Sequence, residues 1–148
     1  MRHEEIAARL QKFEEICRQK GLPVTMQRRV ILESVLRRDD HPTADQIFEA
    51  VQERIPQLSR TTVYRVLDKL LELGVIRRVH LTGGTSRFDG MIRRHHHLVC
   101  TQCNKIIDFE DDNLDQLPLP NRKLQGFEAE DFSVQISGVC ADCRKQKK

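Results

Sequence analysis

With 148 residues, 39% of them hydrophobic and none of them Trp, the chain is long enough for one ordinary domain or two small ones with a mainly aliphatic core. Its net charge of +3 lies in residues 1–84, where 15 Lys and Arg stand against 12 Asp and Glu, and this excess is too mild to imply nucleic acid by itself. No apolar run reaches the roughly 20 residues that cross a bilayer, and the N-terminus lacks the apolar segment of a signal peptide, so we expect a cytoplasmic protein with reduced cysteines.

Residues 5–74 carry the signals of four helices. Apolar side chains recur at steps of three and four from Ile6 to Cys17, which predicts a helix over residues 5–19. Hydroxyl residues that can cap the next three helices precede their apolar stripes: Thr25, Thr43 (with Gln46 in a capping box) and Ser59. The segment VIRRVHLTGGTSRFD, residues 75–89, then predicts two short strands around a Gly-Gly turn.

Short helices followed by a two-stranded hairpin are typical of the winged helix-turn-helix, in which one helix lies in the major groove of DNA. The apolar side chains of the fourth helix leave an outer face rich in Arg, Thr and Tyr, which suit contacts with base edges and phosphates. The predicted DNA contacts are Arg60, Thr61, Thr62, Tyr64 and Arg65 on this helix and Arg77 on the hairpin. The same composition also fits an ordinary solvated helix face, and the order of the elements is what favours DNA.

From residue 95 the sequence changes character. HHHLVC, KIIDFE and FSVQISGVC are strand-like, and the alternation in the last of them predicts a half-buried strand. The segment LDQLPLPNRKLQGF is ambiguous, because Pro118 and Pro120 exclude one continuous helix although Pro120 can open a short one. The predicted fold class is α+β, with a winged-helix DNA-binding domain over residues 1–84, a hinge over 85–94 and a small second domain over 95–148.

Two CxxC pairs form the most specific motif of the chain, Cys100 with Cys103 and Cys140 with Cys143. Four thiolates at this spacing suit a tetrahedral Zn²⁺ without an open position, which is a structural site. Redox dithiols and plain buried thiols are the alternatives, but a thioredoxin-like pair needs a βαβ context that the sequence lacks. Cys17 lies on the apolar stripe of the first helix and is expected in the core.

The run RRHHHLVCTQC, residues 93–103, places three histidines beside the first cysteine pair. Side chains alternate along a strand, so His95 and His97 share one face while His96 and Cys100 point to the other. His95 and His97 are therefore available for a second site, and His96 has no assigned role.

Candidate partners for that second site are a third histidine and two carboxylates that are flanked by apolar residues, where an unpaired charge is costly. The complete candidate set is His41, Asp89, His95, His97 and Asp108. Because it contains only nitrogen and oxygen ligands, this set suits Fe²⁺ or Mn²⁺ better than a structural zinc. The alternative is a polar strand face with surface carboxylates.

These motifs together resemble the ferric uptake regulator family of metal-dependent bacterial repressors. VTMQRRVIL, HPTADQIFEAV, SRTTVYRVLDKLLELGVI, SRFD, HHHLVCTQCNKIIDF and GVCADC follow one another in the family's order and cover nearly the whole chain. The resemblance implies a winged helix, a small α/β dimerisation domain with a structural zinc over residues 95–148, and a regulatory metal at the junction of the domains. It also implies a homodimer that binds a palindromic double-stranded operator.

Within the family, the chain looks most like the peroxide-sensing branch, whose regulatory Fe²⁺ or Mn²⁺ ligands correspond to the five residues of the candidate set. Iron-sensing relatives usually carry Glu in place of Asp108 and a further His in the last strand, and this chain has no His after His97. The implied function is a repressor that releases operator DNA when iron-catalysed oxidation by hydrogen peroxide modifies His41 or His95. The segment LPLPN departs from the family, since relatives usually continue a helix there.

Three other functions remain open. The first is an iron- or zinc-availability repressor of the same family that does not sense peroxide. The second is an enzyme, a mononuclear iron oxygenase, although five protein ligands leave little room for a substrate. The third is a nucleic-acid-binding protein in which the metal is purely structural. We expect a regulator and no enzyme.

Overall fold

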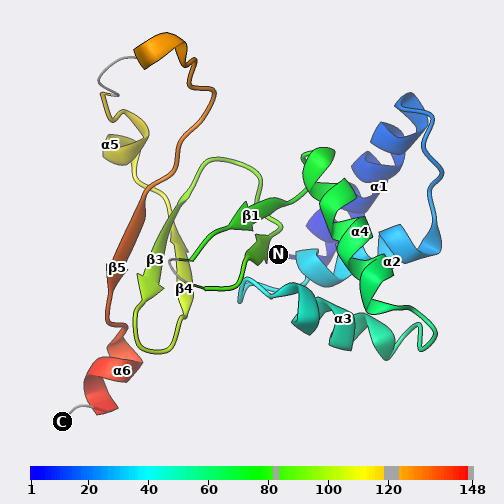
Figure 1. The fold of residues 1–148 in the computed structure, drawn as a ribbon, viewed down its shortest axis with the longest axis horizontal. Coiled ribbons are helices and arrows are strands. Elements are labelled where there is room, and N and C mark those ends of the chain that lie inside the picture. Colours follow the sequence, from blue (N-terminus) through cyan, green and yellow to red (C-terminus); the bar gives the residue numbers. More distant parts are fainter. Residues whose placement is uncertain (82–83, 119–123, 147–148) are drawn as a thin grey trace. The chain divides into compact units, whose positions relative to one another are not determined.

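The computed structural model describes residues 1–81, 84–118 and 124–146. The chain divides into two units, Met1–Ile92 and Arg93–Lys148, which we call the helical unit and the sheet unit (Figure 1). In the described residues, no helix has the length and apolar character that a bilayer crossing requires.

Four helices build most of the helical unit: α1 (His3–Gln19), α2 (Met26–Leu36), α3 (Ala44–Gln52) and α4 (Arg60–Glu72). All three predicted N-caps are confirmed. The Thr25 hydroxyl accepts a hydrogen bond from the Arg28 amide, Thr43 and Gln46 form a capping box, and the Ser59 hydroxyl accepts from the Thr62 amide. Helices α2, α3 and α4 therefore begin where a short polar side chain satisfies the first free backbone amides.

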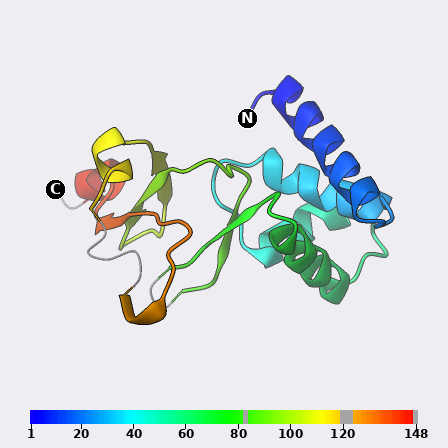
Figure 2. The same ribbon diagram turned by 90° about the horizontal axis from the view of Figure 1, so that it is seen from above.

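Helix α2 is the centre of the helical unit, since it packs against α1, α3 and α4. Figure 2 shows α1 on the outer side of α2. Side chains from all four helices meet in one aliphatic core, and the fully buried ones include Phe13, Cys17, Ile31, Ile47, Val63 and Leu67. The predicted core position of Cys17 is thus confirmed.

A two-stranded hairpin completes the helical unit. Strand β1 (Arg77–Val79) pairs antiparallel with β2 (Arg87–Asp89), and Arg77 lies opposite Asp89. The predicted Gly-Gly turn between the strands falls partly on residues 82–83, which lie outside the described residues. Helices α2 to α4 followed by this hairpin form a winged helix-turn-helix, so the predicted fold of the N-terminal part is confirmed.

The sheet unit contains three strands in the order β4-β3-β5. Strand β3 (His96–Cys100) lies in the centre, antiparallel to β4 (Ile106–Phe109) and parallel to β5 (Gln135–Gly138). Three short helices, α5 (Asp112–Asp115), η1 (Leu124–Gly126) and α6 (Ala141–Gln146), belong to the same unit. Figure 1 shows α5 and α6 at opposite ends of the sheet. A small mixed α/β unit after the winged helix confirms the predicted fold class.

Strand β5 differs from its prediction. The predicted alternation holds just before the strand, where Phe132 and Val134 are half-buried and Ser133 is exposed, but it fails in β5, all four residues of which are exposed, with Ile136 keeping 46% of its surface accessible. Among the described residues, helices α5 and α6 lie at the ends of the sheet and leave Ile136 uncovered. The ambiguous segment begins with the end of α5, and the short helix that Pro120 was expected to open falls on residues 119–123, outside the described residues.

Candidate metal centres and nucleic-acid interface

The four paired cysteines converge at one end of the sheet unit. Cys100 ends β3, Cys103 follows it in a tight turn, and Cys140 and Cys143 flank the start of α6. Their sulfur atoms all lie within 4.8 Å of one another, and the Sγ atoms of Cys103 and Cys140 are 3.8 Å apart. A tetrahedron with Zn–S bonds of about 2.3 Å has edges of about 3.8 Å, so this spacing fits Zn²⁺.

The charge distribution in this cluster also favours a metal. Amide N–H groups of Cys140, Cys103 and Gln102 donate to Cys100 and lower its thiol pKa to about 6. Hydrogen bonds with Cys140 and Cys103, together with burial, raise the pKa of Cys143 to about 12. The cluster therefore holds one thiolate, Cys100, near neutral pH, while Cys143 keeps its proton until a metal displaces it.

A second cluster in the sheet unit joins β3 to β4. The Nε2 atoms of His95 and His97 lie 3.4 Å and 3.2 Å from the same carboxylate oxygen, Oδ1 of Asp108. The two imidazole rings are 4.6 Å apart, centroid to centroid, and His97 pairs with Asp108 in the β3–β4 register. The predicted alternation of the histidines is confirmed, because His95 and His97 meet on one side of the strand.

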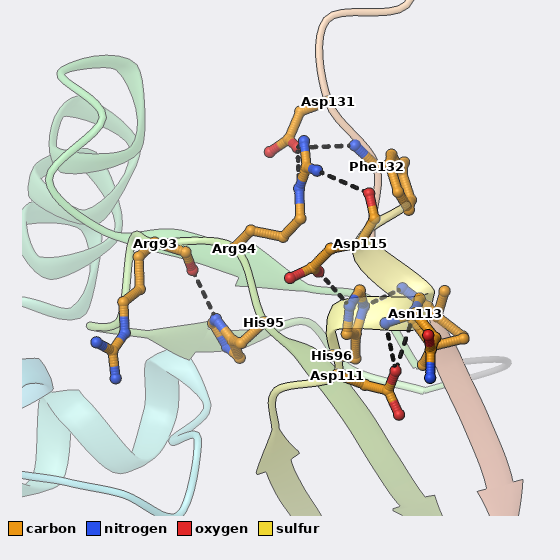
Figure 3. Close-up of polar contacts among 11 residues, drawn as sticks. Arg93, Arg94, His95, His96, Asp111, Asn113, Asp115, Asp131 and Phe132 are labelled. Atoms are coloured by element: carbon orange, nitrogen blue, oxygen red, sulfur yellow. Dashed lines mark hydrogen bonds and ion pairs between the residues drawn. The ribbon is translucent and has the colours of Figure 1, made fainter. Parts of the chain in front are cut away.

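The tautomer of His95 is fixed by its other ring nitrogen. Figure 3 shows that Nδ1 of His95 lies 2.8 Å from the backbone carbonyl of Arg93, which can only accept a hydrogen bond. Nδ1 therefore carries a proton, and Nε2, on the Asp108 side, is the ring nitrogen that remains to bind a metal. This is the tautomer that a metal-binding histidine needs, with a carbonyl orienting the ring from behind.

The helical unit holds a separate pair. His41 and Asp89 are both buried, and His41 Nε2 lies 3.4 Å from Asp89 Oδ2. His41 has a φ of +54°, a left-handed conformation that needs support from its surroundings. Arg87 supplies it, since its guanidinium donates to the carbonyls of His41 and Asp40. Strand β2 thus holds the His41 loop through Arg87 and carries Asp89 two residues later.

The five residues predicted for the regulatory site therefore form two groups of nitrogen and oxygen donors. His41 and Asp89 are together in the helical unit, and His95, His97 and Asp108 are together in the sheet unit. No cysteine takes part in either group. Both groups suit Fe²⁺ or Mn²⁺ by the chemistry of their donors.

His96, which the sequence left without a role, is fully buried and uses both ring nitrogens (Figure 3). Its Nδ1 accepts from the Val134 amide at 3.0 Å, and its Nε2 lies 2.8 Å from Asp115 Oδ1. Since the amide must donate, Nε2 carries the proton and donates to the carboxylate. His96 is therefore a hydrogen-bonded bridge between β3, the end of α5 and the segment before β5.

Arg94, two residues earlier, reinforces that bridge. Its guanidinium binds the Asp131 carboxylate at 2.8 Å, donates to the Asp115 carbonyl at 3.4 Å and stacks on the Phe132 ring at 4.6 Å (Figure 3). The side chains of Arg94 and His96 thus contact α5 and the segment before β5, whereas His95 and His97 face Asp108.

The predicted DNA contacts lie mainly on the outer face of α4. Arg60, Thr61, Tyr64 and Arg65 are exposed, whereas Arg77 on β1 is half-buried. Thr62 is half-buried, and its hydroxyl lies 2.8 Å from that of the cap residue Ser59.

The sequence did not single out several residues that orient these groups. They are Asp45, which binds Arg60 and Tyr64; Arg87, which holds the His41 loop; and Asp115, which binds His96. For Arg87 the available sequence signal was its position in the SRFD motif, two residues before Asp89. Asp45 and Asp115 act across gaps of 15 to 19 residues between elements, and no local pattern marks such contacts.

Comparison with known proteins places the chain in a family. Residues 19–137 match the Ferric uptake regulator family. The peroxide operon regulator of Bacillus subtilis (strain 168) is 33% identical over 141 residues, which cover 95% of this chain and 97% of that protein. Among solved structures, the ferric uptake regulator of Francisella tularensis with iron has a TM-score of 0.70 at 28% identity and covers 84% of this chain and 96% of its own. The peroxide stress regulator of Campylobacter jejuni has a TM-score of 0.68 at 26% identity, with 90% and 98% coverage. The chain belongs to the ferric uptake regulator family of metal-dependent regulators.

Proposed function

We propose that this regulator is a DNA-binding repressor that senses hydrogen peroxide through a regulatory iron. The observation that carries the proposal is the separation of two kinds of donor, four thiols at one site and only imidazoles and carboxylates at the other. Its similarity to the peroxide operon regulator supports the choice of peroxide as the signal. As a regulator it is not an enzyme.

In this proposal the four cysteines hold a structural Zn²⁺, and His41, Asp89, His95, His97 and Asp108 bind one Fe²⁺ or Mn²⁺ with ligands from both units. The two carboxylates balance the charge of a divalent ion, and the three imidazoles complete its coordination as neutral ligands. The Francisella tularensis relative, whose structure contains iron, supports this choice of metal. The metal-bound protein is the form that binds DNA through α4 and the hairpin.

Iron held by these residues would supply the redox chemistry that reduces hydrogen peroxide beside the imidazole rings of His41 and His95. His95 keeps its Nδ1 proton on the Arg93 carbonyl and presents Nε2 for binding. An oxygen atom added to the imidazole ring of His41 or His95 would weaken the ring nitrogens as metal ligands. The two units then lose the ligands that they share, and the DNA-binding conformation loses its stabilisation.

A homodimer on a palindromic operator completes the proposal. Leu98 of β3 pairs with Ile107 on one side and Ile136 on the other, and all three side chains are exposed. This apolar row and the outer edge of β5, which pairs with no strand in the described residues, support a surface for a second copy.

The test compares Fe²⁺- and Mn²⁺-loaded protein on a DNA duplex that the Mn²⁺ form selects from a random pool. Peroxide should release the duplex from the Fe²⁺ form and leave the Mn²⁺ form bound. Peptide mass spectrometry should locate an added oxygen on His41 or His95 of the Fe²⁺ form alone.

DNA release without oxidation of either histidine, reversed by fresh metal, would overturn peroxide sensing. That result would favour the alternative, an iron- or zinc-availability repressor of the same family. A protein that binds the duplex equally with and without the regulatory metal would contradict both.

A further inference from the structure

Two of the predicted DNA-reading side chains are held by an acidic residue of the neighbouring helix. Asp45 lies in the first turn of α3, and its Oδ1 accepts hydrogen bonds from the Arg60 guanidinium and from the Tyr64 hydroxyl, both on α4. The Arg60 guanidinium also lies 4.6 Å from the centre of the Phe48 ring. Helix α3 thus fixes the positions of both side chains on the outer face of α4.

We propose that Asp45 is a positioning residue that raises the specificity of DNA recognition, a role that rests on the proposed DNA-binding function. We call the contacts of Asp45 with Arg60 and Tyr64 the Asp45 latch. Because Arg60 and Tyr64 are four residues apart on one helix, they project side by side, and a single carboxylate orients both.

The latch acts first on non-specific binding. Sequence-independent affinity comes from Lys and Arg side chains that neutralise phosphates and release counterions. An Arg60 already paired with Asp45 contributes no such charge, and the carboxylate itself repels the phosphate backbone. Exposed ion pairs of this kind shift a population by only a few-fold, so the latch lowers non-specific affinity without blocking DNA.

The latch acts differently on base recognition. An arginine has five N–H donors, and the contact with Asp45 occupies Nη1 of Arg60. The remaining donors are held in place by the carboxylate and by Phe48, which lowers the cost of ordering the side chain on a base edge. The affinity of the protein for a duplex with the matching base is therefore mostly retained, while its affinity for a duplex of random sequence falls.

Asp45→Asn tests this role, and Glu49→Gln on the same helix is the matched control. Glu49 is an exposed carboxylate, and its change removes the same charge from α3. Each Mn²⁺-loaded protein is titrated with two duplexes, one that the wild type selects from a random pool and one of random sequence. The titrations are repeated over a range of salt concentrations.

For Asp45→Asn we expect a few-fold tighter binding to the random duplex and a salt slope steeper by about one, because Arg60 becomes free for phosphate. The ratio of selected to random affinity should fall relative to Glu49→Gln. Asp45→Glu, which keeps a carboxylate, should restore part of that ratio. An equal ratio in Asp45→Asn and Glu49→Gln would overturn the inference, and so would an equal loss of affinity for both duplexes.

A second readout needs no DNA. Tyr64 is the only Tyr of the chain and Trp is absent, so intrinsic emission reports Tyr64 alone. A carboxylate that accepts from a phenol quenches its emission, so Asp45→Asn should brighten the free protein and Glu49→Gln should not. Unchanged emission would show that the latch does not form in solution. A wild type that binds neither duplex would instead overturn the proposed function, while the emission still tests the contact.

Discussion

At the scale of single residues, the three consecutive histidines have two different environments. His95 and His97 present Nε2 to one carboxylate, whereas His96 is enclosed, with Val134 and Asp115 on its two nitrogens. Strand alternation alone separated these two sides in the sequence. The partner of His96 was not predictable, because Asp115 lies 19 residues away on a helix that reaches it only in the folded unit.

Removing the Asp115 carboxylate should destabilise the sheet unit. Asp115→Ala leaves the Nε2–H of His96 buried without its acceptor, which costs about 1–3 kcal/mol of unfolding free energy. Asp115→Asn keeps an acceptor oxygen and should cost less. Chemical denaturation of the zinc-loaded protein measures the effect. Asp112→Ala, which removes an exposed carboxylate from the same short helix, is the control, and an equal loss in both alanine variants would contradict the role of Asp115.

The thiol protons of the cysteine cluster give a second prediction at this scale. The amides around Cys100 lower its pKa to about 6, so the group is a thiolate above that pH and a thiol below it. Zinc binding to the metal-free protein should therefore displace about one proton fewer at about pH 7.5 than at about pH 5.5, because Cys100 has already lost its proton at the higher pH. Calorimetry in buffers of different protonation enthalpy counts these protons. Cys17→Ser, outside the cluster, should leave this difference unchanged, and equal counts at the two pH values would contradict the lowered pKa.

At the scale of elements, helix boundaries followed from the sequence and strand burial did not. Thr25, Thr43 and Ser59 were identified as caps because the need for a side-chain acceptor at a helix start is local. The alternation around Ile136 shows which residues share a face, but it carries no information on what covers that face. The exposure of β5 could therefore not be predicted from local sequence patterns.

The cap of α4 supports both stability and DNA binding. Ser59→Ala removes the acceptor of the Thr62 amide, 3.1 Å away, and should lower the unfolding free energy of the helical unit by about 0.5–2 kcal/mol. Because the cap orders the first turn, which carries Arg60 and Thr61, binding to the selected duplex should weaken as well. Thermal denaturation and DNA titration measure the two effects. Ser59→Asp supplies another acceptor and should recover stability, and a failure to recover would show that the cap is not the cause.

At the scale of the whole molecule, the thiolate site and the winged helix were predictable because both rest on local spacing. Two CxxC pairs specify four donors wherever the chain brings them together, and the capped helices with a following hairpin specify the DNA-binding fold. The apolar row of Ile107, Leu98 and Ile136 was not predictable, since it forms only when three separate strands align. Contiguous exposed apolar side chains of this kind are typical of a surface that binds a partner.

Leu98 is the centre of that row, so Leu98→Lys places a charge at the middle of the proposed contact between two copies. Because Leu98 is already 37% exposed, the fold should survive, and retained zinc content checks that it does. We expect Leu98→Lys to shift the protein from dimer to monomer in sedimentation and to weaken binding to a palindromic duplex far more than to a single half-site. Met26→Lys, which adds the same charge at a 69% exposed apolar residue of the helical unit, should leave the dimer intact. A dimer that persists in Leu98→Lys would show that the interface lies elsewhere than on this face of the sheet, because burying an unpaired lysine at the centre of a contact carries a large free-energy cost.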